Sequence, residues 1–205
     1  MKVLIACEYS GVIREAFKAQ GHDAWSCDIL PTEIPGNHYQ GDVREILDKD
    51  WDLMIAHPPC QYLSTSGNRW MKERPERQKH RDEALNFVRL LMDASIPMIA
   101  IENPISVIST QIRKPDQIIQ PYMFGHNARK TTCLWLKNLP KLVPTNIVDS
   151  GEFHFTKSGR KLPKWYNLPP GPERSKIRSK TFEGIATAMA DQWSKVKQYP
   201  LFKGA

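Results

Sequence analysis

The chain lacks a long apolar run: none of its 205 residues form the roughly 20-residue apolar stretch of a membrane-spanning helix. The N-terminal stretch MKVLIACEYSG carries one lysine and a five-residue apolar run, which is shorter than the roughly 7–15 apolar residues of a secretory signal. We therefore expect a soluble, cytoplasmic protein with no membrane partner.

Closely spaced cysteines are also missing. Cys7, Cys27, Cys60 and Cys133 are far apart, and no Cys-x-x-Cys pair occurs. A zinc site built from cysteines is therefore not expected, and we predict no metal. Scattered cysteines in an intracellular chain are usually free thiols, either buried or reactive. Internal repeats and low-complexity segments are absent as well.

Acidic residues are in the minority. The chain has 29 Lys and Arg against 22 Asp and Glu, which gives a net charge of +7. A basic excess favours a polyanionic partner, with nucleic acid first, although it also serves ordinary solubility. Hydrophobic residues make up 40% of the chain, which suffices for a core, so the length predicts one domain over residues 1–205.

Short apolar segments alternate with amphipathic ones along most of the chain. Buried strands are predicted at Lys2–Cys7, Ala24–Cys27, Leu53–Ala56, Pro97–Glu102 and Thr131–Leu136, and helices at Val12–Gln20, Glu83–Ala94 and 182–196. This alternation predicts an α/β fold with a mostly parallel sheet flanked by helices. Loops are expected at Pro31–Gln40 and Ser64–Glu76, and an irregular basic insert at 141–178.

The predicted strands end in polar and reactive residues. In parallel α/β sheets the chemistry lies beyond the carboxyl ends of the strands. Those ends carry Cys7-Glu8, Asp28, His57–Cys60 and Glu102-Asn103. These residues therefore mark the edge of the sheet where a site is expected.

Cys60 follows two prolines at the end of a predicted strand. A rigid turn holds such a thiol in place, and a fixed thiolate can attack an electron-poor ring. Glu102 ends the next predicted strand and would lie beside Cys60 if the strands are neighbours. A carboxylic acid can hydrogen-bond a pyrimidine ring nitrogen while sulfur adds to C6. Taken singly, a structural cysteine and a capping or ion-paired glutamate are the simpler interpretations.

Together these motifs resemble, in order, those of the DNA cytosine-C5 methyltransferase family. The matching segments are ACEYSGVIREAFKAQGHDAWSCDI for the first cofactor motif and the strand after it, GDV for the adenine contact, PPCQYLS for Pro-Cys-Gln, IENP for Glu-Asn-Val and ARKTTCLWL for Arg-x-Arg. The resemblance covers residues 1–140 well and 179–197 loosely, in a compact form without a full target-recognition domain.

The resemblance implies a Rossmann-like methyltransferase fold, S-adenosylmethionine as cofactor and DNA as partner. Cys60 would be the nucleophile, Glu102 the acid that contacts the base, and Arg129 a further catalytic residue. The implied cofactor contacts are Cys7, Glu8, Tyr9, Ser10, Gly11, Asp28, Ile29, Asp42, Val43, Pro58 and Ile185; the implied substrate contacts are Gln61, Ser64, Asn103 and Lys130.

A basic segment lies between the ARKTTCLWL motif and the predicted C-terminal helix. Lys157, Arg160, Lys161 and Lys164 are interleaved with aromatic residues, which suits phosphate contact and base stacking, so we predict a minimal DNA-contact element. The alternative is a solvated loop whose aromatics pack on the core. A second basic run, from Arg69 to Arg81, either flanks the catalytic pocket or forms a solvated face.

The chain departs from the family pattern in several places. Ile29 replaces an aromatic residue, Lys130-Thr131 lacks the second arginine, and Ile185 stands where the family has asparagine. A separate specificity subunit or self-association would then supply target recognition. A lean recognition region suits a phage or mobile-element gene, and hence the cytoplasm of a bacterial or phage-infected cell. The alternatives are a non-catalytic DNA-binding subunit or mimic, and a C5-transferase for RNA or nucleotides.

Overall fold

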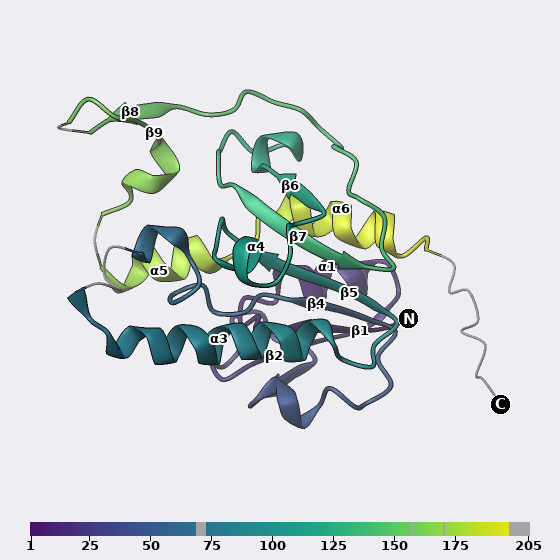
Figure 1. Cartoon of the computed structure of the whole chain (residues 1–205). Coiled ribbons are helices and arrows are strands. Elements are labelled where there is room, and N and C mark those ends of the chain that lie inside the picture. The colour runs from purple at the N-terminus through teal and green to yellow at the C-terminus, as the bar shows by residue number, and fades with distance from the viewer. Residues whose placement is uncertain (69–72, 157, 170, 197–205) are drawn as a thin grey trace.

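A seven-stranded sheet forms the centre of the protein (Figure 1). The computed structural model describes residues 1–68, 73–156, 158–169 and 171–196. The strands are β1 (Lys2–Ala6), β2 (Asp23–Asp28), β3 (His38–Gln40), β4 (Leu53–Ala56), β5 (Met98–Asn103), β6 (Gln117–Ile119) and β7 (Thr132–Lys137). Their order is β3-β2-β1-β4-β5-β7-β6. The first five are parallel, and β7 runs antiparallel to both of its neighbours.

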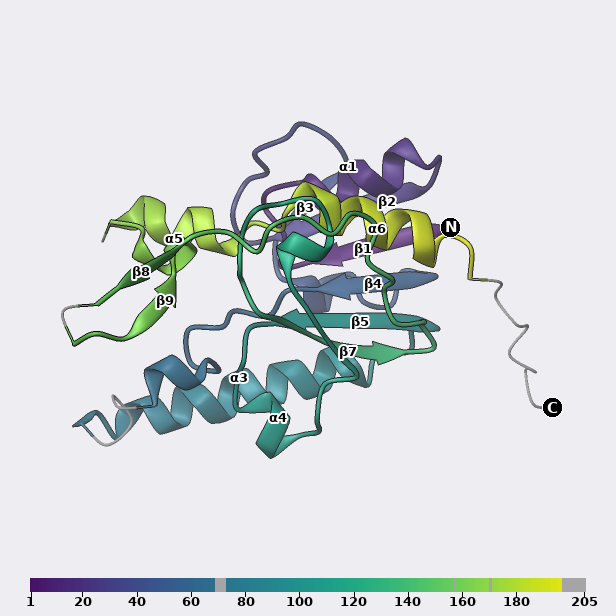
Figure 2. The same cartoon turned by 90° about the horizontal axis from the view of Figure 1, so that it is seen from above.

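Helices cover both faces of this sheet (Figure 2). One face carries α1 (Val12–Ala19) and α6 (Glu183–Trp193), which contact each other, and the other carries α3 (Glu76–Met92) and the short α4 (Ile108–Gln111). Alternate residues of β1 enter the two cores: Val3 and Ile5 pack towards α1 and α6, and Leu4 and Ala6 towards α3. Because both faces are buried, the strands read as continuous apolar runs rather than alternating ones.

The predicted α/β class with a mostly parallel, helix-flanked sheet is confirmed by this topology. The apolar run at Leu53–Ala56 gives the bounds of β4 without change. The other predicted strands shift by one residue at one or both ends. Among the described residues, no helix is both long and apolar enough to cross a membrane.

The start of α3 corrects the predicted helix at Glu83. The helix begins at Glu76, inside the segment expected to be a loop. Its first turns carry charged, mostly exposed residues, and its first buried residue is Leu85. Hydrophobic periodicity marks only the part of a helix that contacts the core, so the polar first turns gave no such signal. Three short elements, β3, β6 and α4, were also not predicted.

The insert at 141–178 is more ordered than expected. It contains the hairpin strands β8 (Phe153–Phe155) and β9 (Lys161–Pro163), a 3₁₀ turn at Lys164–Asn167 and the helix α5 (Pro172–Ser179). The hairpin pairs antiparallel, with Phe153 opposite Pro163. Strands of three residues are too short to show a period, which explains why pattern analysis missed them.

Candidate active site

The strand order reverses between β1 and β4, because β2 lies on the outer side of β1 and β5 on the outer side of β4. In doubly wound sheets a crevice opens at this point, beyond the carboxyl ends of the strands. Ala6, Ala56 and Ile101 are register partners across β1, β4 and β5. The residues that follow them, Cys7, His57 and Glu102, therefore lie side by side at one level of the sheet edge.

Cys60 begins a tight turn immediately after β4. Its carbonyl oxygen accepts hydrogen bonds from the backbone N–H groups of Leu63 (3.2 Å) and Ser64 (2.9 Å). The same loop is fastened to the segment after β5, because Val107 N–H donates to the Leu63 carbonyl (2.9 Å) and Ser64 forms a β-bridge with Ser106. These bonds hold the thiol at the edge shared by β4 and β5.

Glu102 and His57 form a half-buried pair at this edge. His57 Nδ1 lies 3.3 Å from Glu102 Oε2, and the two side chains are 11% and 14% exposed. Burial opposes ionisation of the Glu102 carboxyl, but the His57 hydrogen bond, the charge of Lys130 and a hydrogen bond from Thr132 outweigh it and lower its pKa. Glu102 is therefore a carboxylate in the free protein, and it is already supplied with a proton donor.

The thiol of Cys60 experiences opposing influences. The residue as a whole is exposed, but its sulfur is enclosed enough that burial is the largest cause raising its pKa, followed by the negative charge of Glu102. Its backbone N–H, Lys130 and Arg178 act in the opposite direction. Glu102, Lys130 and Arg178 are thus the three charged side chains whose fields act on the thiol. Of the three charges, Arg178 was not anticipated from the sequence.

Unsatisfied polar atoms gather in the two loops that carry Cys60 and Glu102. Among the described residues, His57 Nε2, Asn103 Oδ1 and Ser106 Oγ are buried without a hydrogen-bond partner. Asn103 is held in place by its amide, which donates to the Pro58 carbonyl (2.8 Å). A buried polar atom without a partner is costly, so such a cluster suits a polar ligand with donors and acceptors, such as a nucleobase.

The turn between β1 and α1 uses its side chains internally. Gly11 precedes the helix with φ +78°. The Glu8 carboxylate accepts hydrogen bonds from Ile13 N–H (2.8 Å) and from the Ser10 hydroxyl (3.1 Å), and both acceptor and hydroxyl are buried. A carboxylate at a helix N-terminus satisfies otherwise unpaired N–H groups. Glu8 and Ser10 therefore cap α1, and they would contact a ligand only through their backbone.

The expected adenosine contacts fall into two groups. Asp28 ends β2 and accepts one bond from Leu30 N–H (2.9 Å), while Ile29 beside it is 75% exposed, so both can reach a ligand. The Asp42 carboxylate is instead engaged by the Arg44 guanidinium, which lowers its pKa.

Four other expected cofactor residues are buried or nearly buried. Val43 and Ile185 belong to the two cores, and Pro58 is enclosed beneath Asn103. Cys7 has φ +57°, and burial raises its pKa far above the usual range of a thiol. The structure thus gives the side chains of Val43 and Ile185 a packing role, and only backbone atoms there can meet a ligand.

Arg129 and Lys130 point to different partners. The Arg129 guanidinium donates to Ser150 Oγ (2.7 Å) and lies over the rings of Tyr122 and Phe153 at 5.5 and 5.0 Å. Its contacts therefore hold the insert, and its charge is not among those that act on Cys60. Lys130 instead donates its Nζ to the carbonyl of Lys180 (3.0 Å) and acts on both Cys60 and Glu102.

The basic insert presents its charges on the hairpin. Arg160 and Lys161 are exposed, Lys164 pairs with Glu152 at 2.5 Å, and Lys157 lies outside the described residues. Phe155 is 70% exposed on the same hairpin. The aromatic residues of the insert are thus divided: Trp165 packs on Phe182 (ring centroids 5.0 Å apart), while Phe155 faces solvent.

Helix α5 is the element of the site that sequence analysis missed. Tyr9, in the β1–α1 turn, donates its hydroxyl to the carbonyl of Lys176 (3.1 Å), and Glu33 pairs with Lys176 (3.0 Å) and Lys180 (2.5 Å). The helix therefore rests on the turn expected to hold the cofactor. Gln61 and Ser64 lie on the Cys60 loop, with Gln61 exposed and Ser64 half-buried.

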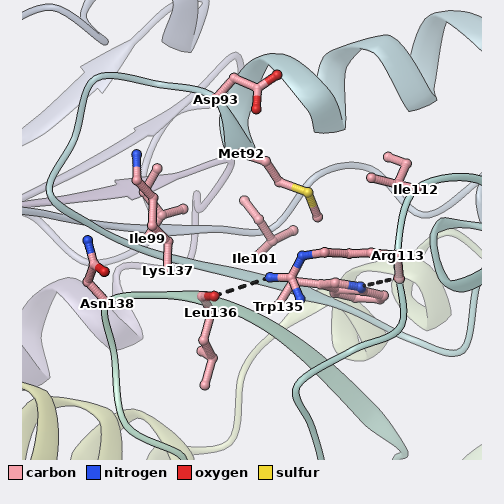
Figure 3. A pocket seen from close by; sticks show the side chains of 10 residues that line it. All are labelled: Met92, Asp93, Ile99, Ile101, Ile112, Arg113, Trp135, Leu136, Lys137 and Asn138. Atoms are coloured by element: carbon pink, nitrogen blue, oxygen red, sulfur yellow. Dashed lines mark hydrogen bonds between the residues drawn. The ribbon is translucent and has the colours of Figure 1, made fainter.

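A cavity of about 490 Å³ lies elsewhere, between the end of α3 and β7 (Figure 3). Met92, Ile101, Arg113, Trp135 and Asn138 contribute to its wall. None of the expected site residues lines it, and the end of α3 and of antiparallel β7 place it towards the amino edge of the sheet. Within the described ranges, no cluster of three or more His, Cys, Asp or Glu could hold a metal ion.

Comparison with solved structures shows a distant likeness to a protein of known fold. No family model and no curated protein matches the chain. A solved structure from Escherichia coli, described as a "putative DNA modification methyltransferase encoded within prophage", is similar with a TM-score of 0.46 and 16% identity over 72% of this chain. The chain spans about half, 51%, of that protein. Similarity of this degree assigns no activity, so the function has to be argued from the site itself.

Proposed function

We propose that the protein is an S-adenosylmethionine-dependent methyltransferase that methylates C5 of cytosine in DNA. The observation that carries this proposal is the placement of Cys60 after β4 and Glu102 at the end of the adjacent parallel strand β5. The carboxylate is close enough to raise the pKa of the thiol. A nucleophile and a hydrogen-bonding acid on neighbouring strand ends are what addition to a pyrimidine ring requires.

The proposed reaction uses each of these groups in turn. Cys60 gives its proton to the Glu102 carboxylate, and its sulfur adds to C6 of a cytosine that has left the base stack. Glu102 passes this proton to N3 and accepts a hydrogen bond from the exocyclic amine. C5 thereby becomes nucleophilic and would take the methyl group from the sulfonium of S-adenosylmethionine, whose S–CH3 bond would break to leave a neutral thioether. A base removes the proton from C5, the C5–C6 double bond re-forms and the thiolate leaves. The N3 proton returns through Glu102 to the thiolate when the adduct breaks down. Between these steps the His57 hydrogen bond keeps the Glu102 carboxylate from being buried and unpaired.

S-Adenosylmethionine would supply the methyl group as an electrophile. The residues of the crevice fit a nucleoside of this kind in part: Asp28 ends β2 with an oxygen available for ribose hydroxyls, and the turn after β1 brings backbone N–H groups to the start of α1. Asp42 could receive an amine only by sharing or releasing Arg44. The side chains of Glu8 and Ser10 contribute to the helix cap rather than to binding.

DNA as the partner is supported by basic residues on both sides of the site. The first turns of α3 carry Arg77, Lys79 and Arg81, and the insert carries the hairpin and α5. Figures 1 and 2 both place the start of α3 and the insert at the same edge of the sheet, beyond the carboxyl ends of β4 and β5. Positive charge on two sides of a reactive thiol suits a phosphate backbone passing over it.

The decisive experiment is transfer of a radiolabelled methyl group from S-adenosylmethionine to unmethylated double- and single-stranded DNA. We expect label in 5-methylcytosine with the wild-type protein and with Cys133→Ala, which removes a thiol buried in the core on the α3 side of the sheet. Cys60→Ser should abolish transfer while cofactor binding, measured by calorimetry, persists. Full transfer by Cys60→Ser would rule out the nucleophile.

Two other results would point to the alternatives. Cys60-dependent label in RNA or in free cytidine nucleotides, but not in DNA, would assign a different C5 substrate. Absence of both label and cofactor binding, with DNA binding retained, would favour a non-catalytic DNA-binding module.

A further inference from the structure

We propose that Lys130 and Arg178 together form a binding site for the backbone phosphates of the nucleotide whose base reaches Cys60. This inference rests on the proposed function, and it names residues from two distant segments, the loop before β7 and the last turn of α5.

Two contacts hold the Lys130 side chain next to the end of α5: its own hydrogen bond and the bond made by Arg129. Its ammonium donates to the Lys180 carbonyl (3.0 Å) just beyond α5, and the side chain is half-buried. Arg129, next to it, is occupied by Ser150 and two aromatic rings. Arg129 therefore stabilises the insert, whereas Lys130 contacts the end of α5 and acts on the thiol.

Arg178 is held in place by packing. Its guanidinium lies 5.3 Å from the ring centroid of Tyr166, and the carbonyl of Tyr166 accepts a hydrogen bond from Arg174 Nη2 (3.1 Å). Arginine over an aromatic face keeps its charge and its donor edges while it loses mobility. The half-buried Arg178 is thus pre-positioned by an aromatic ring.

Glu33, the acid paired with α5, forms its ion pairs with residues other than Arg178. Glu33 accepts ion pairs from Lys176 and Lys180, which flank Arg178 in the sequence. Tyr9 adds a hydrogen bond to Ser179 Oγ (2.9 Å). These contacts fix α5 against the β1–α1 turn. Among the side chains that the structure describes, no ion pair to a carboxylate is found for Lys130 or Arg178.

The positions of these two cations agree with a phosphate ligand. The register of Asn103 with Cys133 puts the loop of Lys130 beyond the carboxyl end of β5, and the Tyr9 hydroxyl ties α5 to the turn after β1 at the same edge. In agreement with this placement, both cations favour the Cys60 thiolate, although burial and Glu102 outweigh them. Half-buried cations gain from a ligand that is itself an anion, and guanidinium pairs with phosphate through two parallel hydrogen bonds. A flipped nucleotide carries a phosphate on each side of its sugar, so a base at Cys60 brings phosphates to this region.

Protection of Cys60 from alkylation tests the proposal without any methyl donor. Iodoacetamide modification of Cys60 is followed by mass spectrometry, with deoxycytidine or deoxycytidine 3′,5′-bisphosphate as protecting ligand. Each rate is divided by the unprotected rate of the same variant, because Arg178→Gln itself changes thiol reactivity. We expect the bisphosphate to protect the wild type at about tenfold lower concentration than the nucleoside.

The ratio of the protecting concentration of deoxycytidine to that of the bisphosphate should fall towards one in Arg178→Gln and in Lys130→Gln. Arg89→Gln, an exposed arginine on the second half of α3, should leave it unchanged. Circular dichroism melting verifies that the variants fold. Equal protection by the two ligands in the wild type, absence of protection by either, or an unchanged ratio in Arg178→Gln would overturn the phosphate site. Because the alkylation assay contains no methyl donor, it tests the phosphate site even if the protein does not transfer methyl groups.

Discussion

His57 Nδ1 lies 3.3 Å from Glu102 Oε2, at the carboxyl ends of two neighbouring parallel strands. The imidazole gives the carboxylate a hydrogen-bond partner, and it helps to lower the pKa of that carboxyl against the effect of burial. The carboxylate in turn raises the pKa of the Cys60 thiol. A resting site of this kind keeps the nucleophile protonated, and it becomes reactive when a ligand neutralises or occupies Glu102.

Glu102→Gln should therefore have opposite effects on two reactions of Cys60. Removing the negative charge lowers the pKa of the thiol, so alkylation by iodoacetamide at a fixed pH should become faster. Methyl transfer should fall by about 10²–10⁴-fold, because the amide cannot take part in proton transfer to the base. Glu83→Gln, an exposed change on α3, is the matched control. Slower or unchanged alkylation would contradict the electrostatic coupling.

Glu33→Gln should loosen α5. The carboxylate loses its ion pairs with Lys180 and Lys176, and because these side chains are partly exposed we expect a loss of about 0.5–1 kcal/mol in unfolding free energy. The Lys180 hydrogen bond is the largest cause that lowers the pKa of Glu33. Its stabilisation is thus fully present above the unfolded pKa of about 4.3 and disappears as pH falls through the lower folded value.

Limited proteolysis of the insert reports this loosening. Cleavage after Lys176 or Arg178 should be faster in Glu33→Gln than in the wild type at neutral pH, and the difference should vanish in acid. Glu183→Gln, at the start of α6, serves as the control. Equal cleavage rates at neutral pH would show that the ion pairs do not hold the helix.

Arg14→Met should strongly destabilise the fold. The Arg14 side chain is fully buried and donates to Glu15 (2.9 Å), Ser26 (2.8 Å), Thr32 (3.1 Å) and the carbonyl of Ile34 (2.5 Å). Without the guanidinium these acceptors lose their hydrogen-bond donors. We therefore expect the unfolding free energy, measured by chemical denaturation, to fall by about 3–5 kcal/mol. Lys18→Met on the exposed side of the same helix should change stability by less than about 0.5 kcal/mol. A small effect at Arg14 would mean that water replaces its bonds.

Gly184→Ala tests a close approach at the start of α6. A methyl group there would clash with the carbonyl oxygen of Phe124, and Gly184 N–H also donates to His126 Nε2 (2.9 Å). The clash should cost about 3 kcal/mol in thermal unfolding. Gly67→Ala, where the nearest atom is 3.8 Å away, should be nearly neutral. Similar melting temperatures for the two variants would argue against tight packing at this position.

Replacing Arg160, Lys161 and Lys164 with alanine should weaken DNA binding. If the hairpin contacts phosphates, the slope of log affinity against log salt should fall by about one for each lost contact. Lys114, Lys137 and Lys141 are three exposed lysines placed elsewhere on the molecule, and their triple replacement is the charge-matched control. Fluorescence anisotropy with labelled duplex DNA measures both slopes. Equal slopes in the two triple variants would exclude the hairpin from the interface.

Local sequence patterns predicted much of the fold. The apolar run Leu53–Ala56 predicts β4 because a strand buried on both faces needs only apolar residues. The polar residues after the strands were predicted to lie together at one edge of the sheet, and the parallel pairing of β1, β4 and β5 brings them there. The first turns of α3 and the insert were not predicted, because their residues are mostly exposed or form elements too short to show a period.

The sequence by itself determined the class of the sheet and the strand ends that carry Cys60 and Glu102. Only the tertiary structure decided which charges meet there. The Tyr9 hydroxyl contacts α5 across 167 positions, and Arg178 rather than Arg129 is brought to the thiol. Local preferences fix how a segment folds, whereas the partners of a long charged side chain depend on how distant segments pack, and no periodicity along the chain records that choice.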